Sequence, residues 1–279
     1  MGDHRKVKAL GYGEILANGG LIDTWREAFD IESGEVVSLV GAGGKTTLMF
    51  ALARELAAPK KLVITTTTTK IFYPSSSDTP YVLVSEKDDE IADFILNKAE
   101  KYGHITIASE NIVSSGKLKG LDPELIAGLC RLKPVSCIIV EADGAAGRPL
   151  KAPNIDHEPV IPQNSSLVIP VVGIDALGCE LSEAHVFRSE IAAKLSGNAL
   201  GDVVSPDTVA TLMTHPSGII CGSPVQSRIV PFVNKTDLND GLSNARILAS
   251  RILKAGHPQI GRVVLGQAKS QPPVLEVVT

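Results

Sequence analysis

The chain has 279 residues, of which 44% are hydrophobic and 21% are charged, and its formal net charge is -4 at pH 7. This is the composition of a soluble globular protein with a sizeable core, and the slight negative charge argues against binding to nucleic acid or to a membrane surface. No apolar run approaches the about 20 residues that cross a bilayer, and the N-terminus lacks the apolar core of a signal peptide. We therefore expect a cytoplasmic protein.

The cysteines and the N-terminal charges add little to this picture. Cys130, Cys137, Cys179 and Cys221 show no C-x-x-C spacing. The positions of the four cysteines therefore favour neither a zinc site nor a redox motif, and they suit a protein of the reducing cytoplasm. The basic cluster at positions 4–8 is more typical of a solvated tail than of a binding arm.

Apolar β-branched runs alternate with amphipathic segments along the chain. The recurrence of Leu21, Trp25 and Phe29 at intervals of four predicts a packed helix. Strands are predicted at 36–40, 62–64, 81–84, 104–108, 135–140, 167–172, 229–233 and, as the last one, 262–265. Helices are predicted at 46–57, 86–101, from 122 onward, 205–213 and 242–254. This alternation predicts an α/β fold with a mostly parallel, doubly wound sheet and helices on both faces.

A glycine-rich turn between the first strand and the following helix is the strongest motif. Its sequence is Gly41-Ala42-Gly43-Gly44-Lys45-Thr46-Thr47. Glycines let the backbone approach a phosphate closely, and the free N–H groups of a helix start bind anions. A lysine here reaches the β- and γ-phosphates, and the next hydroxyl is a ligand for Mg²⁺. We expect a P-loop NTPase that binds a nucleoside triphosphate with Mg²⁺.

The loop is shorter than the full pattern G-x-x-x-x-G-K-[ST], because Leu39 stands where the first glycine would be. The turn opens instead at Gly41, and loops shortened in this way resemble those of Mur-type ligases. The alternative is a glycine-rich turn that binds nothing, and the buried strand that leads into the turn argues against that alternative.

Two acids end the strand at 135–140. Glu141 and Asp143 are two positions apart, so both side chains can face the crevice at the carboxyl end of the sheet. We expect Asp143 to bind the metal and Glu141 to orient the attacking water. The alternative is a strand that ends in a polar turn. Arg148 or Lys151 could neutralise phosphate charge, although Lys151 is more typical of a solvated surface charge.

A second nucleotide motif, Asn234-Lys235-Thr236-Asp237, follows the apolar run at 229–233. It matches the N-K-x-D motif of GTPases. A carboxylate accepts from both guanine N1–H and the exocyclic amine that adenine lacks, while the lysine stem packs on the base and the asparagine steadies the loop. The alternative is that Asp237 caps the next helix.

Together these motifs resemble the selenium cofactor biosynthesis protein YqeC family, also called the selenium-dependent molybdenum hydroxylase accessory protein family. The resemblance extends over nearly the whole chain after about residue 20 and also includes the segments 65–70, 157–162 and 172–178. It implies a role in maturing the selenium-containing centre of molybdenum hydroxylases, with such an enzyme or its cofactor machinery as partner. It further implies that Thr66, Thr67, Thr68 and Lys70 border the nucleotide and that His157 and Glu158 contact substrate or metal.

Three functions stay open at this point. The first is an NTPase, with GTP favoured over ATP, in which Lys45, Glu141, Asp143 and Arg148 are catalytic. The second is an ATP-dependent activating enzyme of kinase or ligase type, which the shortened loop favours. The third is a non-catalytic nucleotide-binding scaffold.

The long stretch between Asp143 and the second motif predicts one domain over 1–279 with an inserted element at about 150–227. The Pro-rich part at 144–166 predicts a functional ordered loop. Homodimerisation is common among such accessory proteins, but no pattern here indicates it.

Overall fold

The computed structural model describes residues 22–279. The basic cluster at 4–8 and Leu21 lie outside the described residues. The first helix, α1 (Trp25–Phe29), contains the other two residues of the predicted helical spacing.

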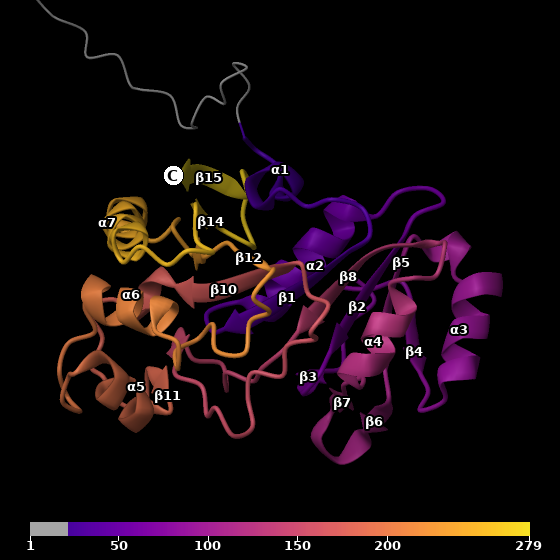
Figure 1. Ribbon diagram of the computed structural model, residues 1–279, viewed down its shortest axis with the longest axis horizontal. Helices are drawn as coiled ribbons and strands as arrows, with labels where there is room; N and C mark the ends of the chain where they lie inside the picture. The colour runs from indigo at the N-terminus through magenta and orange to yellow at the C-terminus, as the bar shows by residue number, and fades with distance from the viewer. Residues whose placement is uncertain (1–21) are drawn as a thin grey trace, which may run out of the picture.

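A central sheet forms the middle layer of the molecule (Figure 1). Its ten strands are β1 (Glu35–Gly41), β2 (Leu62–Thr67), β4 (Val82–Val84), β5 (His104–Ala108), β8 (Val135–Glu141), β10 (Leu167–Gly173), β12 (Arg228–Ile229), β13 (Phe232–Asn234), β14 (Val263–Gly266) and β15 (Val274–Val278). The order is β15-β14-β13-β10-β1-β8-β2-β5-β4, with β12 paired to β10. The pairs are parallel except β14 with β15. The predicted mostly parallel sheet is therefore confirmed.

Helices cover both faces of this sheet (Figure 1). They are α1, α2 (Lys45–Leu56), α3 (Asp88–Asn97), α4 (Pro123–Leu129), α5 (Ser189–Ser196), α6 (Pro206–Thr214) and α7 (Gly241–Lys254), with short 3-10 turns η1 (Glu100–Tyr102), η2 (Val113–Ser115) and η3 (Ile174–Ala176). Buried side chains of α1 and α2 belong to one hydrophobic core, and those of α3, α4, α5, α6 and α7 belong to the other.

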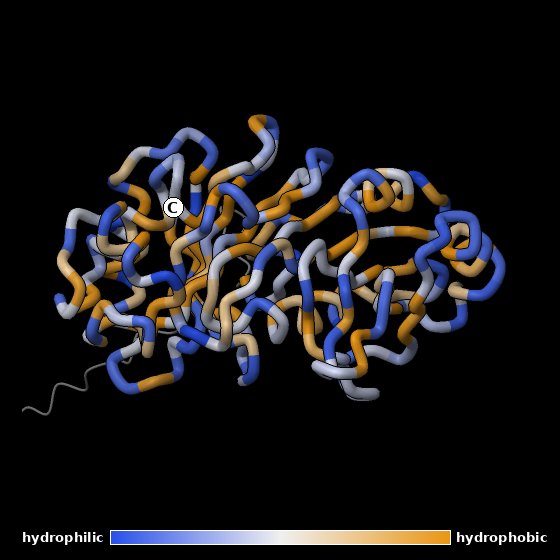
Figure 2. The backbone as a smooth tube through the Cα atoms, turned by 90° about the horizontal axis from the view of Figure 1, so that it is seen from below, coloured by the Kyte–Doolittle hydropathy of each residue, from blue (hydrophilic) through white to orange (hydrophobic). Residues whose placement is uncertain are grey.

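The strands are apolar on both faces because both faces are covered. In β1, Val36 and Val40 point into one core, and Val37 and Leu39 point into the other. Figure 2 shows the same pattern along the chain, with hydrophobic stretches in the interior and hydrophilic ones mainly at the outer turns.

Two small sheets lie outside the central one. One has the order β3-β7-β6, from β3 (Lys70–Phe72), β6 (Glu110–Ile112) and β7 (Lys117–Lys119). The other pairs β9 (Leu150–Lys151) with β11 (Val186–Phe187). Neither small sheet was predicted from the sequence, because strands of two or three residues are too short to show a periodicity.

Several predicted boundaries are corrected. The single strand at 229–233 is two strands, β12 and β13, because Pro231 cannot donate a ladder hydrogen bond. The strand at 262–265 is not the last, since β15 follows it. The stretch at 150–227, where an inserted element was predicted, contains β10, a central strand beside β1. Among the described residues, no helix is long and apolar enough to cross a membrane.

Candidate functional site

The glycine-rich turn joins β1 to α2 and packs against the end of β10. Gly43 has φ 80° and Gly44 has φ 126°. A Cβ on Gly43 would lie 2.1 Å from the backbone nitrogen of Gly173, and one on Gly44 would lie 2.3 Å from Nδ2 of Asn234. Glycine is thus required here both by the backbone angles and by the space available. The turn leaves the first N–H groups of α2 without partners inside the helix.

Lys45 is the first residue of α2, and its side chain is 3% exposed. Its ammonium group donates to the carbonyl oxygen of Gly41 and lies 3.0 Å from Oδ1 of Asp143 and 3.8 Å from Oε1 of Glu141. Burial lowers the pKa of Lys45, but these two carboxylates outweigh burial and raise the pKa above its ordinary value. The lysine is therefore charged and available to exchange a carboxylate for another anion.

The side chains of Thr46 and Glu141 place two oxygens next to each other at the start of α2. Thr46 Oγ1 donates a 2.7 Å hydrogen bond to Oε2 of Glu141. Glu141 reaches this position because β8 lies beside β1 in parallel register, with Glu141 opposite Leu39. Burial raises the pKa of Glu141, and the nearby ammonium of Lys45 and the hydrogen bond from Thr46 oppose that rise. These two oxygens are of the type that Mg²⁺ prefers.

Asp143 is more deeply buried than Glu141. It is 1% exposed, its Oδ2 accepts from the backbone N–H of Gly41 at 3.0 Å, and the same oxygen lies 2.9 Å from Nζ of Lys151. Lys151 also bonds Oε2 of Glu158 at 3.2 Å. The interpretation of Lys151 as a solvated surface charge is wrong, because the side chain is fully buried between two carboxylates. A buried cation needs such partners.

The second motif lies on the other side of the glycine-rich turn. Asn234 donates from Nδ2 to the carbonyl oxygen of Gly43 at 2.8 Å and accepts from the N–H of Ala268 at 2.9 Å. This asparagine therefore links the second motif to the glycine-rich turn, as a residue that steadies the loop would. The next helix begins at Gly241 with Asp240 as its N-cap. Asp237 therefore does not cap it, and the helix-cap alternative is wrong.

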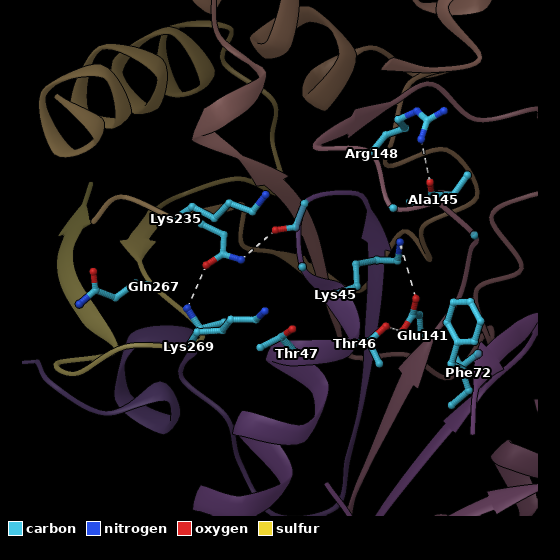
Figure 3. Close-up of a pocket in the computed structure, with 18 of the residues that line it drawn as sticks. Lys45, Thr46, Thr47, Phe72, Glu141, Ala145, Arg148, Lys235, Gln267 and Lys269 are labelled. Carbon is cyan, nitrogen blue, oxygen red and sulfur yellow. Dashed lines mark hydrogen bonds and ion pairs between the residues drawn. The ribbon is translucent and has the colours of Figure 1, made fainter. Parts of the chain in front are cut away.

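One cavity of about 800 Å³ joins these features. Its walls include the helix start from Gly43 to Thr47, Glu141, Arg148 and all of the second motif except Thr236. Figure 3 shows Lys45 near the middle of this cavity, with Glu141 and Phe72 to one side and Lys235 and Gln267 to the other. The sequence separates these groups widely, and the carboxyl ends of neighbouring parallel strands bring them together, as expected in a doubly wound sheet.

Some predicted site residues lie elsewhere. Asp143, Gly41 and Ala42 do not line this cavity, although Gly41 holds Asp143 and Lys45 in place. Thr68 lies on a second cavity and donates to the carbonyl oxygen of Val160 at 2.7 Å. Arg148 reaches the main cavity but donates to the carbonyl oxygen of Glu183 at 2.7 Å.

The residues that the resemblance added are similarly divided. Lys70 lines the main cavity, whereas Thr66 and Thr67 are buried and donate to backbone carbonyl oxygens. Glu158 lines the second cavity, and His157 is exposed. Further residues that line the cavity were not predicted from the sequence, among them Phe72, Lys117, Leu238, Gln267 and Lys269. None belongs to a motif, so no sequence signal could have found them.

Comparison with known proteins identifies the family. The family model described as YqeC protein matches residues 37–190, which is more than half of the chain. The chain belongs to the YqeC protein family. It is also 36% identical, over 201 residues, to a protein of Escherichia coli (strain K12) whose name is uncharacterized protein YqeC. That match covers 72% of this chain and 75% of the relative.

The family match begins within β1 and ends within α5. It therefore includes the glycine-rich turn, the threonine tract, both acids and the loop that carries Glu158. The motif from Asn234 to Asp237 lies beyond the matched residues. The family model therefore covers the part of the cavity that the glycine-rich turn and Glu141 form.

Proposed function

We propose that this chain binds a nucleoside triphosphate with Mg²⁺ and acts as a P-loop NTPase that prefers GTP over ATP. The observation that carries the proposal is the single cavity that joins a helix start, the oxygen pair of Thr46 and Glu141, and the motif from Asn234 to Asp237. The phosphates and the metal would lie at one end of this cavity, by the helix start and Glu141, and the base would lie at the other end, by the second motif.

The phosphates would lie on the first turn of α2, where the backbone N–H groups and the helix dipole favour anions. Lys45 would exchange its carboxylate partners for the β- and γ-phosphate oxygens. Thr46 and Glu141 would hold Mg²⁺, which commonly takes one or two protein oxygens together with phosphate oxygens, and the ion would neutralise charge on the phosphates. This proposal gives Glu141 the role expected for Asp143. Asp143 instead fixes Lys45, Lys151 and the N–H of Gly41.

The base would lie between Lys235, Leu238 and Gln267, which line the far end of the cavity. The Asp237 side chain is exposed there, with Oδ2 3.2 Å from Oγ of Ser270. Its carboxylate is free to accept from guanine N1–H and the exocyclic amine. One hydrogen of the Asn234 amide holds Gly43. The other can donate to the base edge, since an amide nitrogen carries two.

The biological role that we propose comes from the resemblance and not from the site. It is an accessory role in maturing the selenium-containing centre of molybdenum hydroxylases, with the hydroxylase or its cofactor machinery as partner. If the role needs the nucleotide, a Lys45→Ala variant will fail to support hydroxylase maturation in cells. Full maturation with that variant would favour the scaffold alternative.

Calorimetric titration of the full chain with GTP and with ATP, each with Mg²⁺, tests the proposal. We expect tighter binding of GTP, and a loss of about 100-fold in GTP affinity in Asp237→Ala, because a paired carboxylate contributes about 3 kcal/mol. Asp93→Ala, an exposed acid on α3, is the matched control. A preference for ATP would favour the activating enzyme, and absence of binding to both nucleotides would refute the proposal.

A further inference from the structure

A second cavity, of about 850 Å³, adjoins the proposed nucleotide cavity and shares Lys70, Lys117 and Gly144 with it. Gly144 follows the two acids at the end of β8. The shared wall therefore lies at the metal side of the first cavity, away from the motif that would bind the base. Figure 3 agrees with this placement. Phe72 follows Lys70 by two positions in β3 and pairs with Lys117, and the figure shows it on the Glu141 side of Lys45.

The small sheet β3-β7-β6 supplies the lysines of this wall. Lys70 pairs with Lys119 across antiparallel strands, and Phe72 pairs with Lys117. Alternation in strands places these four residues on one face, while Ile71 and Leu118 between them point into the core. Like charges directly opposite each other destabilise a strand pair. Three lysines on one face of a three-stranded sheet thus call for a compensating anion.

The protein itself supplies little of that compensation. Among the side chains that the structure describes, no acid lies within 4.0 Å of the ammonium groups of Lys70 or Lys117, and Lys119 has one contact, at 3.9 Å, with Glu110. Among the acids around the second cavity, Glu86 and Asp88 are exposed and make no ion pair with these lysines. Glu158 is held by Lys151 and Arg188 at 3.2 Å each. Asp122 accepts from the N–H of Glu124 at 2.8 Å.

We propose that the second cavity binds a small polar molecule through an oxyanion group, such as a phosphate, that lies against Lys70, Lys117 and Lys119. Through the shared wall this group would lie next to the terminal phosphate of the nucleotide, with two of the lysines reducing the repulsion between them. The cavity would then hold a second ligand of the nucleotide reaction. This inference rests on the proposed nucleotide-binding function.

Two variants change the second cavity and leave the first intact, because Lys119 and Glu86 line only the second. Lys119→Gln removes a cation. Glu86→Lys places a new cation at an exposed position. Both sites are on the surface, so neither variant endangers folding. Lys101→Gln, an exposed lysine on the wall of a separate cavity, is the control.

The test is calorimetric titration of the full chain with inorganic phosphate, first with Mg²⁺ and a saturating non-hydrolysable GTP analogue, and then without nucleotide. We expect phosphate to bind in the presence of the analogue. One exposed charge contact contributes about 1 kcal/mol, so we expect binding about fivefold weaker in Lys119→Gln, about fivefold tighter in Glu86→Lys and unchanged in Lys101→Gln. Acetate in place of phosphate distinguishes a carboxylate site from a phosphate site.

Two results would overturn the inference. One is phosphate that competes with the analogue, which would place it on the helix start of α2. The other is equal phosphate affinity in the wild type and both cavity variants. If the analogue does not bind at all, the proposed function fails, and the titrations without nucleotide still decide whether the second cavity binds an oxyanion.

Discussion

Nδ2 of Asn234 donates a 2.8 Å hydrogen bond to the carbonyl oxygen of Gly43, although 191 positions separate the two residues in the chain. The asparagine is 4% exposed, and its Oδ1 accepts from the N–H of Ala268. One buried amide therefore joins the glycine-rich turn, the second motif and the loop after β14. The position of the glycine-rich turn depends on the loop that would contact the base.

Asn234→Asp should break the hydrogen bond between the second motif and the glycine-rich turn. The substitution replaces the donor by a carboxylate that faces the carbonyl oxygen of Gly43, so two acceptors meet in a buried place. We expect a loss of about 2–4 kcal/mol in the free energy of unfolding and at least a tenfold loss in nucleotide affinity. Urea unfolding and calorimetry measure the two. Asn244→Asp, at an exposed position of α7, is the control, and equal stability of both variants would contradict the argument.

Gly43→Ala separates backbone strain from steric clash when it is compared with Gly178→Ala. The two glycines have φ 80° and 81°, but a Cβ at Gly178 would meet nothing within 4 Å, whereas at Gly43 it would meet the backbone of Gly173. We expect Gly178→Ala to cost about 1–2 kcal/mol from the left-handed conformation alone. Gly43→Ala should cost at least about 2 kcal/mol more, in the range of overpacked sites. Equal costs in chemical denaturation would show that the turn can relax.

Glu141→Gln and Asp143→Asn should affect different properties. Glu141 lines the cavity, so its amide variant should fold normally but lose most of the Mg²⁺ dependence of nucleotide binding, because a neutral oxygen is a weaker ligand for a hard cation. Asp143 lies between two buried lysines. Its amide variant should lose about 3–5 kcal/mol of stability, as expected when one partner of a buried ion pair is removed.

Urea unfolding and calorimetry with and without Mg²⁺ distinguish the two variants. If Asp143→Asn were stable and had lost the metal dependence, Asp143 would be the metal ligand that the sequence analysis expected.

The buried His104 should lower the free energy of unfolding in mild acid, because its imidazole takes up a proton more readily in the unfolded chain than in the folded one. Burial lowers the pKa of His104 to about 4, and Arg54 adds to this. The unfolded chain binds this proton below its ordinary pKa of about 6.5, so the unfolded state holds more protons between pH 6.5 and 4. The free energy of unfolding should therefore fall by up to about 3 kcal/mol as the pH drops through this range.

In His104→Asn, this part of the pH dependence should be missing from urea unfolding curves. His157→Asn, at an exposed position, should retain it. Identical pH profiles of His104→Asn and the wild type would show that the imidazole takes up no proton on unfolding.

Most of the fold could be predicted from the sequence, since long apolar runs such as 135–140 and helices such as 242–254 carry a clear period. The errors lie where a tertiary contact overrides the local pattern. β12 begins at Arg228, which pairs with Leu167 of β10 three positions before Pro231. β15 completes the sheet edge from a short segment next to Pro272 and Pro273. Lys151 resembles a surface residue in sequence, and the carboxylates of Asp143 and Glu158 on its two sides make its burial tolerable.

Residue types along the chain were enough to predict the candidate chemistry of each loop: the glycines and lysine of the turn, the acids at the end of β8, and the Asn-Lys-x-Asp run. Such residue types act through local backbone conformation and side-chain chemistry, which short motifs already contain. Which acid faces the cavity depends on the tertiary structure. Glu141 is the last residue of β8 and points at Thr46, whereas Asp143, two positions on, turns beneath the loop to meet two lysines. The strand register and the packing of distant segments fix that choice, and neither can be read from positions along the chain.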